Sequence, residues 1–251
     1  EWRFGLPESD GSIFRYIGKL VAEGGTMYVD EGEYVMSEPI VLGPGNGSRI
    51  IAPKGPEKTA IRVADVAKFT SQKYRAVTLS KATAFVSGVT FAGGYAGPHY
   101  SGSVYGIYGV VSMTAEATVT NCVFRDIREA SYGTDVEGMG VRMSAGLVVD
   151  CRFANISSQG SGGTGMNGAA LRLTGGTADR IVVDGCFCRS PFDMHTSGYG
   201  DIVYANGAST VLKNVLVTGC TTTKSVPVGV ADGSVINCTV ACNTNNAPLT
   251  W

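Results

Sequence analysis

The sequence predicts a β-solenoid, a domain of stacked coils, and three observations lead to that prediction. First, a six-residue phrase, Val-x-[Asn/Asp]-Cys-x-Phe in its fullest form, recurs along the chain. Second, its copies follow one another in steps of 33, 29, 35, 34 and 18 residues, mostly within the range typical of repeat architectures. Third, each copy holds short alternating β-type runs separated by Asn, Asp or Gly, without a helical pattern long enough for a helix–turn–helix repeat. The copies are Val86–Phe91, Val119–Phe124, Val148–Phe153, Val183–Cys188, Val217–Thr222 and Val235–Val240.

Length and composition fit one elongated domain over residues 1–251. The 35 glycines and the low share of charged residues, 16%, suit tight turns and stacked strands. A formal net charge of −1 gives no overall attraction to nucleic acid or anionic membrane. No apolar run approaches the length of a membrane span, and no signal peptide is present in this chain, which begins at Glu1. We expect a capping helix over 12–24, stacked coils over 26–240 and a tail or cap over 241–251.

The repeat accounts for five of the seven cysteines. It predicts that they occupy one inward column, and because strands of neighbouring coils lie about 4.8 Å apart, the thiols would form a vertical ladder. Buried cysteine behaves as a small apolar residue, which favours a reduced packing ladder over structural disulfides. Two histidines and the absence of a CxxC pair argue against zinc. The column comprises Cys122, Cys151, Cys186, Cys220 and Cys238, and leaves out Cys188 and Cys242.

The N-terminal helix is predicted from apolar spacing. Ser12 suits an N-cap, and Gly24 and Gly25 end the pattern. The apolar face would consist of Ile13, Phe14, Ile17, Leu20 and Val21. Since the first coil of a solenoid exposes an open core, we interpret this helix as its lid.

The segment that follows carries a family resemblance. Gly25–Val29, Gly32–Tyr34 and Pro39–Val41 resemble the opening of parallel β-helix proteins of the pectate-lyase-like superfamily, and the later copies are similar to that family's coil with its turn asparagine. The resemblance covers nearly the whole chain. It implies an all-β, single-stranded right-handed parallel β-helix, often opened by a capping helix. It does not imply one activity, because this fold hosts lyases, hydrolases, esterases, epimerases, adhesins and phage proteins.

A second inward column is predicted before the long loops. It pairs Val77 with Leu79, Val111 with Met113, Val141 with Met143, Leu171 with Leu173 and Val228 with Val230, and residue 203 or 204 supplies the missing member. Alternation along a strand then places the residues between them outward. These outward residues are Thr78, Ser112, Arg142, Arg172 and Gly229, so two arginines are expected to stack on adjacent coils.

The long loops fall at one point of the coil, between the Phe column and the second column. Coils that stack in register project such loops from one side, and variable loops on a rigid scaffold commonly carry function. In the family that the chain resembles, the substrate cleft runs along this side. Our candidate substrate-binding residues there are Tyr95, His99, Tyr100, Tyr132 and Tyr199.

These residue types suit an acidic polysaccharide. Tyrosine rings stack on sugars, and arginines bind carboxylates in a bidentate manner. In a lyase, Arg142 and Arg172 would neutralise a uronate carboxylate. His195 or Tyr199 would exchange protons, with Asp193 or Asp201 orienting the histidine. The run Phe192–His195 is similar to the Phe-Asp-Pro-His core of mannuronan epimerases, although the Pro is absent. No cofactor is indicated, and no calcium-like Asp cluster stands out.

Two classes of function therefore remain open for a secreted or cell-surface protein. The catalytic signatures of polygalacturonases, pectin methylesterases and pectate lyases are missing, which favours glycan binding over cleavage. The alternative is a non-catalytic adhesin or structural domain, in which solvated arginines and packed tyrosines have no ligand. The tail Cys242–Trp251 also has two interpretations: Trp251 covers the last coil, or the native chain continues.

Overall fold

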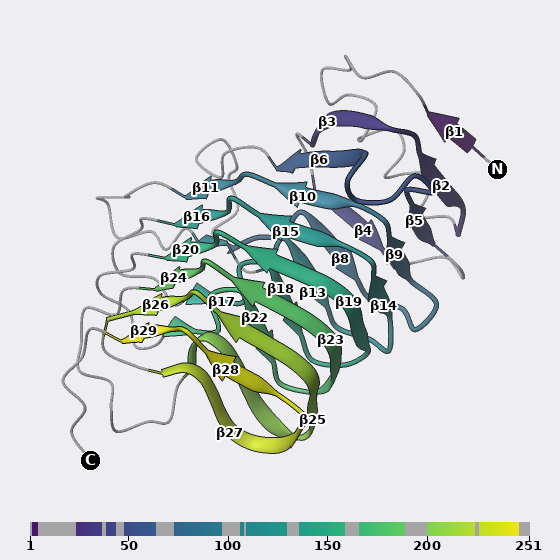
Figure 1. Cartoon of the computed structure of the whole chain (residues 1–251). Coiled ribbons are helices and arrows are strands. Elements are labelled where there is room, and N and C mark those ends of the chain that lie inside the picture. The colour runs from purple at the N-terminus through teal and green to yellow at the C-terminus, as the bar shows by residue number, and fades with distance from the viewer. Residues whose placement is uncertain are drawn as a thin grey trace.

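The protein is a parallel β-solenoid, in which each coil lies on the one before it (Figure 1). The computed structural model describes residues 2–4, 24–36, 39–43, 48–63, 73–96, 106–107, 109–129, 136–158, 166–188, 200–223 and 226–245. These residues form strands and turns without a helix. The predicted capping helix falls almost wholly outside them. Among the described residues, no helix is long and apolar enough to span a membrane.

Three long ladders of parallel strands form the walls. Ladder A comprises β2 (Thr26–Val29), β5 (Arg49–Ile51), β9 (Phe85–Ser87), β14 (Thr118–Thr120) and the first parts of β19 (Leu147–Ala154) and β23 (Gly176–Asp184); it then takes the middle of β25 (Gly200–Thr218) and the end of β27 (Val226–Ile236). Ladder B comprises β3 (Gly32–Met36), β6 (Thr59–Val63), β10 (Thr90–Ala92), β15 (Val123–Arg125), the later parts of β19, β23 and β25, and β28 (Thr239–Ala241). Ladder C comprises β4 (Ile40–Leu42), β8 (Val77–Leu79), β13 (Val111–Met113), β18 (Val141–Met143), β22 (Leu171–Leu173) and the starts of β25 and β27.

Shorter strands complete the coils. One short ladder follows ladder B and consists of β11 (Tyr95–Ala96), β16 (Arg128–Glu129), β20 (Ser157–Ser158), β24 (Phe187–Cys188), β26 (Thr221–Thr222) and β29 (Thr244–Asn245). Two pairs precede ladder C: β7 (Lys73–Tyr74) with β12 (Gly106–Ile107), and β17 (Val136–Glu137) with β21 (Met166–Asn167). At the N-terminal end, β1 (Trp2–Phe4) pairs in parallel with β2.

The core is built from columns of identical or similar side chains. Phe91, Phe124 and Phe153 are fully buried on ladder B, and their rings stack with centroids 5.4 and 4.9 Å apart. The close spacing follows from the register, since these three residues are direct partners on neighbouring strands. Offset aromatic stacking adds to the free energy that burial provides.

The second inward column is confirmed residue by residue. Val77, Val111, Val141 and Leu171 are partners in turn, and Val203 is the missing member between Leu171 and Val228. The outward positions also agree, because Ser112, Arg142, Arg172, Tyr204 and Gly229 pair in one row. Tyr204 is nevertheless only 2% exposed, so this outward row is largely covered.

The predicted single column of five cysteines is wrong, because the later copies of the repeat are aligned differently on the coils. Cys151 is the partner of Ile181, not of Cys186, so the five cysteines do not form one column. Cys122, Cys151 and Cys238 belong to the corner between ladders A and B. Cys186 and Cys220 belong instead to the corner after ladder B, below Ile127 and Ile156. All seven cysteines are free, and the five of the predicted ladder form two separate groups.

Both corners use the same pattern of turn residues, which explains why Cys186 and Cys220 were wrongly assigned to the column of Cys122 and Cys151. Most of these turns place one residue at positive φ and follow it with an inward apolar residue; Gly93, followed by Gly94, and Cys242, followed by Asn243, are the exceptions. The corner between ladders A and B, the first corner, has Gly88, Asn121, Asp150, Arg180, Asn214 and Asn237 at positive φ. The corner after ladder B, the second corner, has Gly93, Asp126, Asn155, Gly185, Gly219 and Cys242. Asn, Asp and Gly are the residues that best tolerate this conformation, so both corners select a similar phrase.

Candidate functional site

The predicted arginine pair does lie on adjacent coils. Arg142 of β18 and Arg172 of β22 are direct partners, and both side chains are half-buried. Backbone from the preceding segment crosses close to this row: a Cβ on Gly138 would lie 3.0 Å from the Arg172 Cβ and 2.4 Å from the Val141 carbonyl oxygen. Gly138 therefore has to be glycine both for its positive φ of 58° and for the close approach.

The other predicted site residues are not brought together in the described part of the chain. Tyr95 begins β11 and Asp201 belongs to β25, but their side chains are outside what the structure describes. The remaining candidates lie outside the described residues altogether: His99, Tyr100, Tyr132, Asp193, His195 and Tyr199.

The described residues form a different candidate site on the outer face of ladder B. Because the phenylalanine column points inward, the residues on either side of it point outward. Three of these outward residues are arginines, Arg62 on β6, Arg125 on β15 and Arg152 on β19. Arg128 on β16 follows directly after the second corner and is also exposed. We call the surface that these four residues line the arginine groove.

Two open hollows form the arginine groove. The first, of about 380 Å³, contains three of the arginines, and small residues make its floor. The second, of about 500 Å³, continues it toward β19 and contains Arg125 and Arg152. The floor of the first hollow consists of Ala60, Ala92, Gly93 and Gly94. Absent or short side chains leave this strip of the sheet accessible.

Three of the groove arginines form ion pairs at the surface. Arg62 lies 2.5 Å from Glu33, with the two side chains 61% and 56% exposed. Arg125 Nη1 lies 2.7 Å from the Asp126 carboxylate. Arg152 donates two hydrogen bonds, of 3.1 and 2.7 Å, to the Asp184 carboxylate. That bidentate contact raises the pKa of Arg152, and all three ion pairs keep much of their surface in solvent.

Arg128 differs from the other three. It is exposed at the border of the first hollow and has no ion pair with a described residue. Its guanidinium therefore adds a positive charge that the described carboxylates do not neutralise by contact. An anion in the first hollow could be bound by Arg128 together with Arg62 and Arg125.

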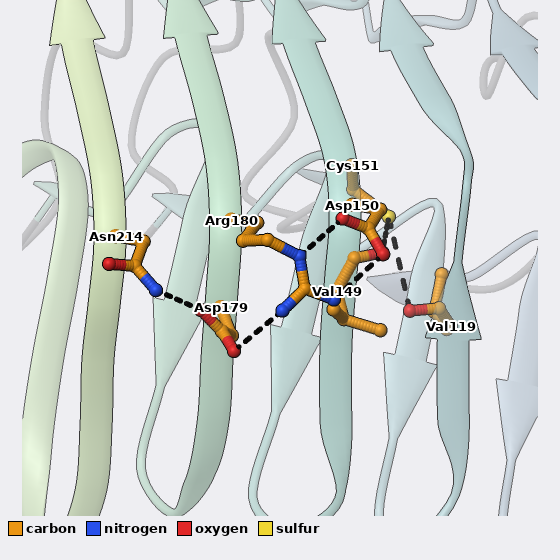
Figure 2. Close-up of polar contacts among 7 residues, drawn as sticks. All are labelled: Val119, Val149, Asp150, Cys151, Asp179, Arg180 and Asn214. Carbon is orange, nitrogen blue, oxygen red and sulfur yellow. Dashed lines mark hydrogen bonds and ion pairs between the residues drawn. The ribbon is translucent and has the colours of Figure 1, made fainter.

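The polar network at the first corner has a structural role. Figure 2 shows Arg180 between two carboxylates, with hydrogen bonds of 2.6 and 2.9 Å to Asp150 and one of 3.1 Å to Asp179. Asn214 donates a 2.8 Å hydrogen bond to the other oxygen of Asp179. The Arg180 guanidinium holds the pKa of the Asp150 carboxyl below its ordinary value of 3.8. Since these groups satisfy one another, the network connects coils rather than offering a binding site.

The surroundings of Cys151 and Cys186 disfavour thiolate chemistry, whereas the hydrogen bond with Cys186 lowers the pKa of Cys220. The Cys122 side chain and burial both raise the pKa of Cys151, and Cys220 with burial raises that of Cys186. A raised pKa disfavours the reactive thiolate. Within the described part of the chain, no group of three or more His, Cys, Asp or Glu side chains could hold a metal ion.

The arginine groove could have been found from the sequence with the correct phase. Arg125 and Arg152 stand next to Phe124 and Phe153, so the Phe column already marks both as outward on one sheet. Arg62 has the same place beside Ile61 two strands away. The arginines predicted from the sequence were those of ladder C, Arg142 and Arg172, and the arginines of ladder B were not among them.

Comparisons with known proteins do not assign the site. Models of known protein families, curated proteins and solved structures were all searched, and none matches the chain. The fold is therefore established by the coil register and the packed columns, and the function has to be argued from the arginine groove.

Proposed function

We propose that this protein is a secreted or cell-surface right-handed β-helix, of the pectate-lyase-like kind, that binds an acidic polysaccharide along the arginine groove. The single observation that carries the proposal is a surface lined by four exposed arginines, three of them around a floor of alanine and glycine and the fourth, Arg152, on the next strand.

The spacing of the arginines suits an extended anionic polymer. Neighbouring strands in a sheet lie about 4.8 Å apart, so Arg62 and Arg125, two strands apart, are separated by about 10 Å at their backbones. Arg152 lies one strand further along. A polymer with a carboxylate or sulfate on successive or alternate sugars could contact several of these arginines at once, which raises its overall affinity through multivalency.

The existing ion pairs do not block such a ligand. Exposed ion pairs contribute about 0–1 kcal/mol to stability, so a ligand carboxylate can replace Glu33 or Asp126 at little cost. The planar guanidinium binds carboxylates and sulfates in bidentate geometry, which makes arginine more selective here than lysine. Arg128 needs no exchange of a described partner and is expected to contribute most to affinity.

One of the aromatic residues predicted from the sequence, Tyr95, adjoins this surface along the chain. Tyr95 follows Gly94, a residue of the groove floor. Sugar stacking by Tyr95 and the other loop aromatics stays part of the proposal, as does proton exchange by His195 with Asp193 or Asp201. The arginine groove itself supports binding, which is the activity we propose first.

A binding screen with matched variants tests the proposal. The purified chain is titrated with oligomers of polygalacturonate, alginate and glycosaminoglycans, and affinity is measured by calorimetry and as a function of salt. We expect Arg128→Gln to weaken binding by about tenfold, on the order of the 1.4 kcal/mol expected for one charged contact. Arg49→Gln is the control, because Arg49 is an exposed arginine of ladder A outside both hollows.

The possible results distinguish the arginine groove from the loop side as the binding site, and distinguish glycan binding from lyase activity and from a structural role. Loss of binding in Arg172→Gln, with Arg128→Gln unaffected, would move the site to the loop side predicted from the sequence. An unsaturated product, detected by its ultraviolet absorbance, would add a lyase activity, and His195→Ala would then test its proton transfer. A chain that binds none of these polymers would contradict the proposal and leave the adhesin or structural domain.

A further inference from the structure

Arginine and alanine alternate in one outward row of ladder B. The direct partners in this row are, in order, Arg62, Ala92, Arg125 and Ala154. Since neighbouring strands lie about 4.8 Å apart, the two arginine positions are about 10 Å apart, with an alanine between them. The other outward residue of the intervening strand β10, Thr90, is only 4% exposed and donates a hydrogen bond to a backbone carbonyl. The first hollow therefore has cationic side chains on two strands and none on the strand between them.

Carboxylates accompany the arginines throughout the groove. Arg62, Arg125 and Arg152 each form an ion pair with a carboxylate. Of the described residues that line each hollow, three are positively charged and two are negatively charged, so each hollow has a net charge of +1. The first hollow has Arg62, Arg125, Arg128, Glu33 and Asp126, and the second has Lys58, Arg125, Arg152, Glu33 and Glu57.

This charge balance suits a ligand whose anionic groups are widely spaced. A sugar unit in an extended chain is about as long as one strand spacing, so a charge on every second sugar matches arginines on every second strand. A charge on every sugar would bring further anions beside Glu33 and Glu57, and like charges placed together oppose binding. An uncharged sugar can instead donate hydroxyl hydrogen bonds to these carboxylates, and such bonds to a charged acceptor are stronger than those between neutral groups.

We propose that the ligand is an acidic polysaccharide in which charged sugars alternate with uncharged ones, and that Glu57 selects against polymers charged on every sugar. This inference rests on the proposed function and narrows it to one class of acidic polysaccharide. Glu57 is exposed in the second hollow and has no ion pair with a described residue, so its charge there is not neutralised by contact. It is therefore the carboxylate whose removal should change selectivity most.

Two matched series of oligosaccharides test the selectivity of the unaltered chain. Chondroitin alternates a uronate with an uncharged sugar, and chondroitin sulfate carries sulfate on that second sugar. We expect calorimetry at one salt concentration to show chondroitin oligomers binding at least about threefold more tightly than sulfated oligomers of the same length. In the second series, oligogalacturonates have none, half or all of their carboxylates methyl-esterified, and the half-esterified oligomers should bind most tightly.

A variant then assigns the selectivity to Glu57. Glu57→Gln should raise the affinity for chondroitin sulfate by about threefold and change that for chondroitin less, because it removes a like charge. Glu116→Gln is the control, since Glu116 is an exposed glutamate outside both hollows, and it should leave both affinities unchanged.

The results that would overturn this inference differ from those that would overturn the proposed function. Tighter binding of the sulfated oligomers, or affinity that falls steadily with esterification, would overturn the alternating class and leave an acidic polysaccharide as the ligand. An unchanged ratio of the two affinities in Glu57→Gln would overturn the role of Glu57. If none of the oligomers bound, the proposed function itself would be contradicted, and this inference with it.

Discussion

The two corners of the solenoid have the same backbone conformation but are stabilised differently. At the first corner, side chains connect successive coils: Arg180 binds Asp150, Asn214 binds Asp179, and Asn237 donates a 2.6 Å hydrogen bond to Asn214. At the second corner, only Asn155 and Asp126 among the described turn residues connect coils through their side chains, with a 2.6 Å hydrogen bond. The next two positions are glycines, and the Asn243 side chain then bonds to the backbone of Cys220 and Val217 in the preceding coil.

Because of this difference, the first corner stabilises the stack of coils, whereas the second corner leaves a surface accessible to a ligand. From Asp150 to Asn237 the first corner carries a continuous polar network on the outside of the coils, so its surface there is occupied. The second corner borders the arginine groove through Gly93, Gly94 and Asp126, and its small residues leave that surface open. A solenoid turn needs one residue at positive φ, and either an asparagine hydrogen-bonded to the next coil or a glycine can provide it. The side chains at the turns can therefore stabilise the fold at one corner and leave space for binding at the other.

The largest expected effect is steric and falls on the first corner. Gly88 has a φ of 76°, and a Cβ there would lie 2.2 Å from the Ala52 carbonyl oxygen. Gly88→Ala should therefore lower the free energy of unfolding by about 3 kcal/mol, from overpacking and the left-handed conformation together. The measurement is urea denaturation followed by circular dichroism. An equal loss in Gly185→Ala, where no atom lies within 4 Å of the added Cβ, would show that conformation alone decides.

The next effect measures the side-chain network. Asn214 has a φ of 52°, donates to Asp179 and accepts from Asn237. We expect Asn214→Ala to cost about 2 kcal/mol of unfolding free energy, combining left-handed strain with two lost hydrogen bonds. Asn214→Gly keeps the backbone conformation and isolates the hydrogen bonds. Asn155→Ala at the second corner removes one hydrogen bond and should cost less; an equal or greater cost would contradict the asymmetry between the corners.

A smaller effect depends on pH. The pKa of Asp150 is lowered in the folded state by Arg180, so this pair stabilises the fold above the unfolded value of about 3.8 and loses that contribution as pH falls through the folded pKa. Arg180→Gln should therefore reduce the acid dependence of stability in this range. Denaturation curves at several acidic pH values, compared with those of Arg125→Gln on ladder B, next to the second corner, test whether the change belongs to the first corner.

The smallest effect is a gain. Gly185 has a φ of 60° with open space around it, and asparagine tolerates this conformation better than other residues with a side chain. Gly185→Asn should raise the free energy of unfolding by about 0.5 kcal/mol, because it restricts the unfolded chain without strain in the folded one. Thermal unfolding detects the shift. If Gly185→Asn lowered the free energy of unfolding by more than Gly185→Ala does, the second corner would require glycine at this position.

Much of the fold could be predicted from local pattern. The alternation around Val111, Val141 and Leu171 predicted the ladder C register and the outward row through Arg142 and Arg172, because side-chain direction in a strand follows from parity. The phase of the later copies could not be predicted this way. Val183–Cys188 has the same turn pattern as Val148–Phe153 but occupies the next corner, since both corners need one left-handed residue before an inward one.

The sequence by itself determined that this chain forms stacked β coils with apolar columns, because repeat spacing, alternation and turn residues are local properties. Only the tertiary structure decided which coil positions become neighbours. Parallel pairing joins residues about thirty positions apart, so it alone places Cys151 beside Ile181 and gathers Arg62, Arg125 and Arg152 on one face.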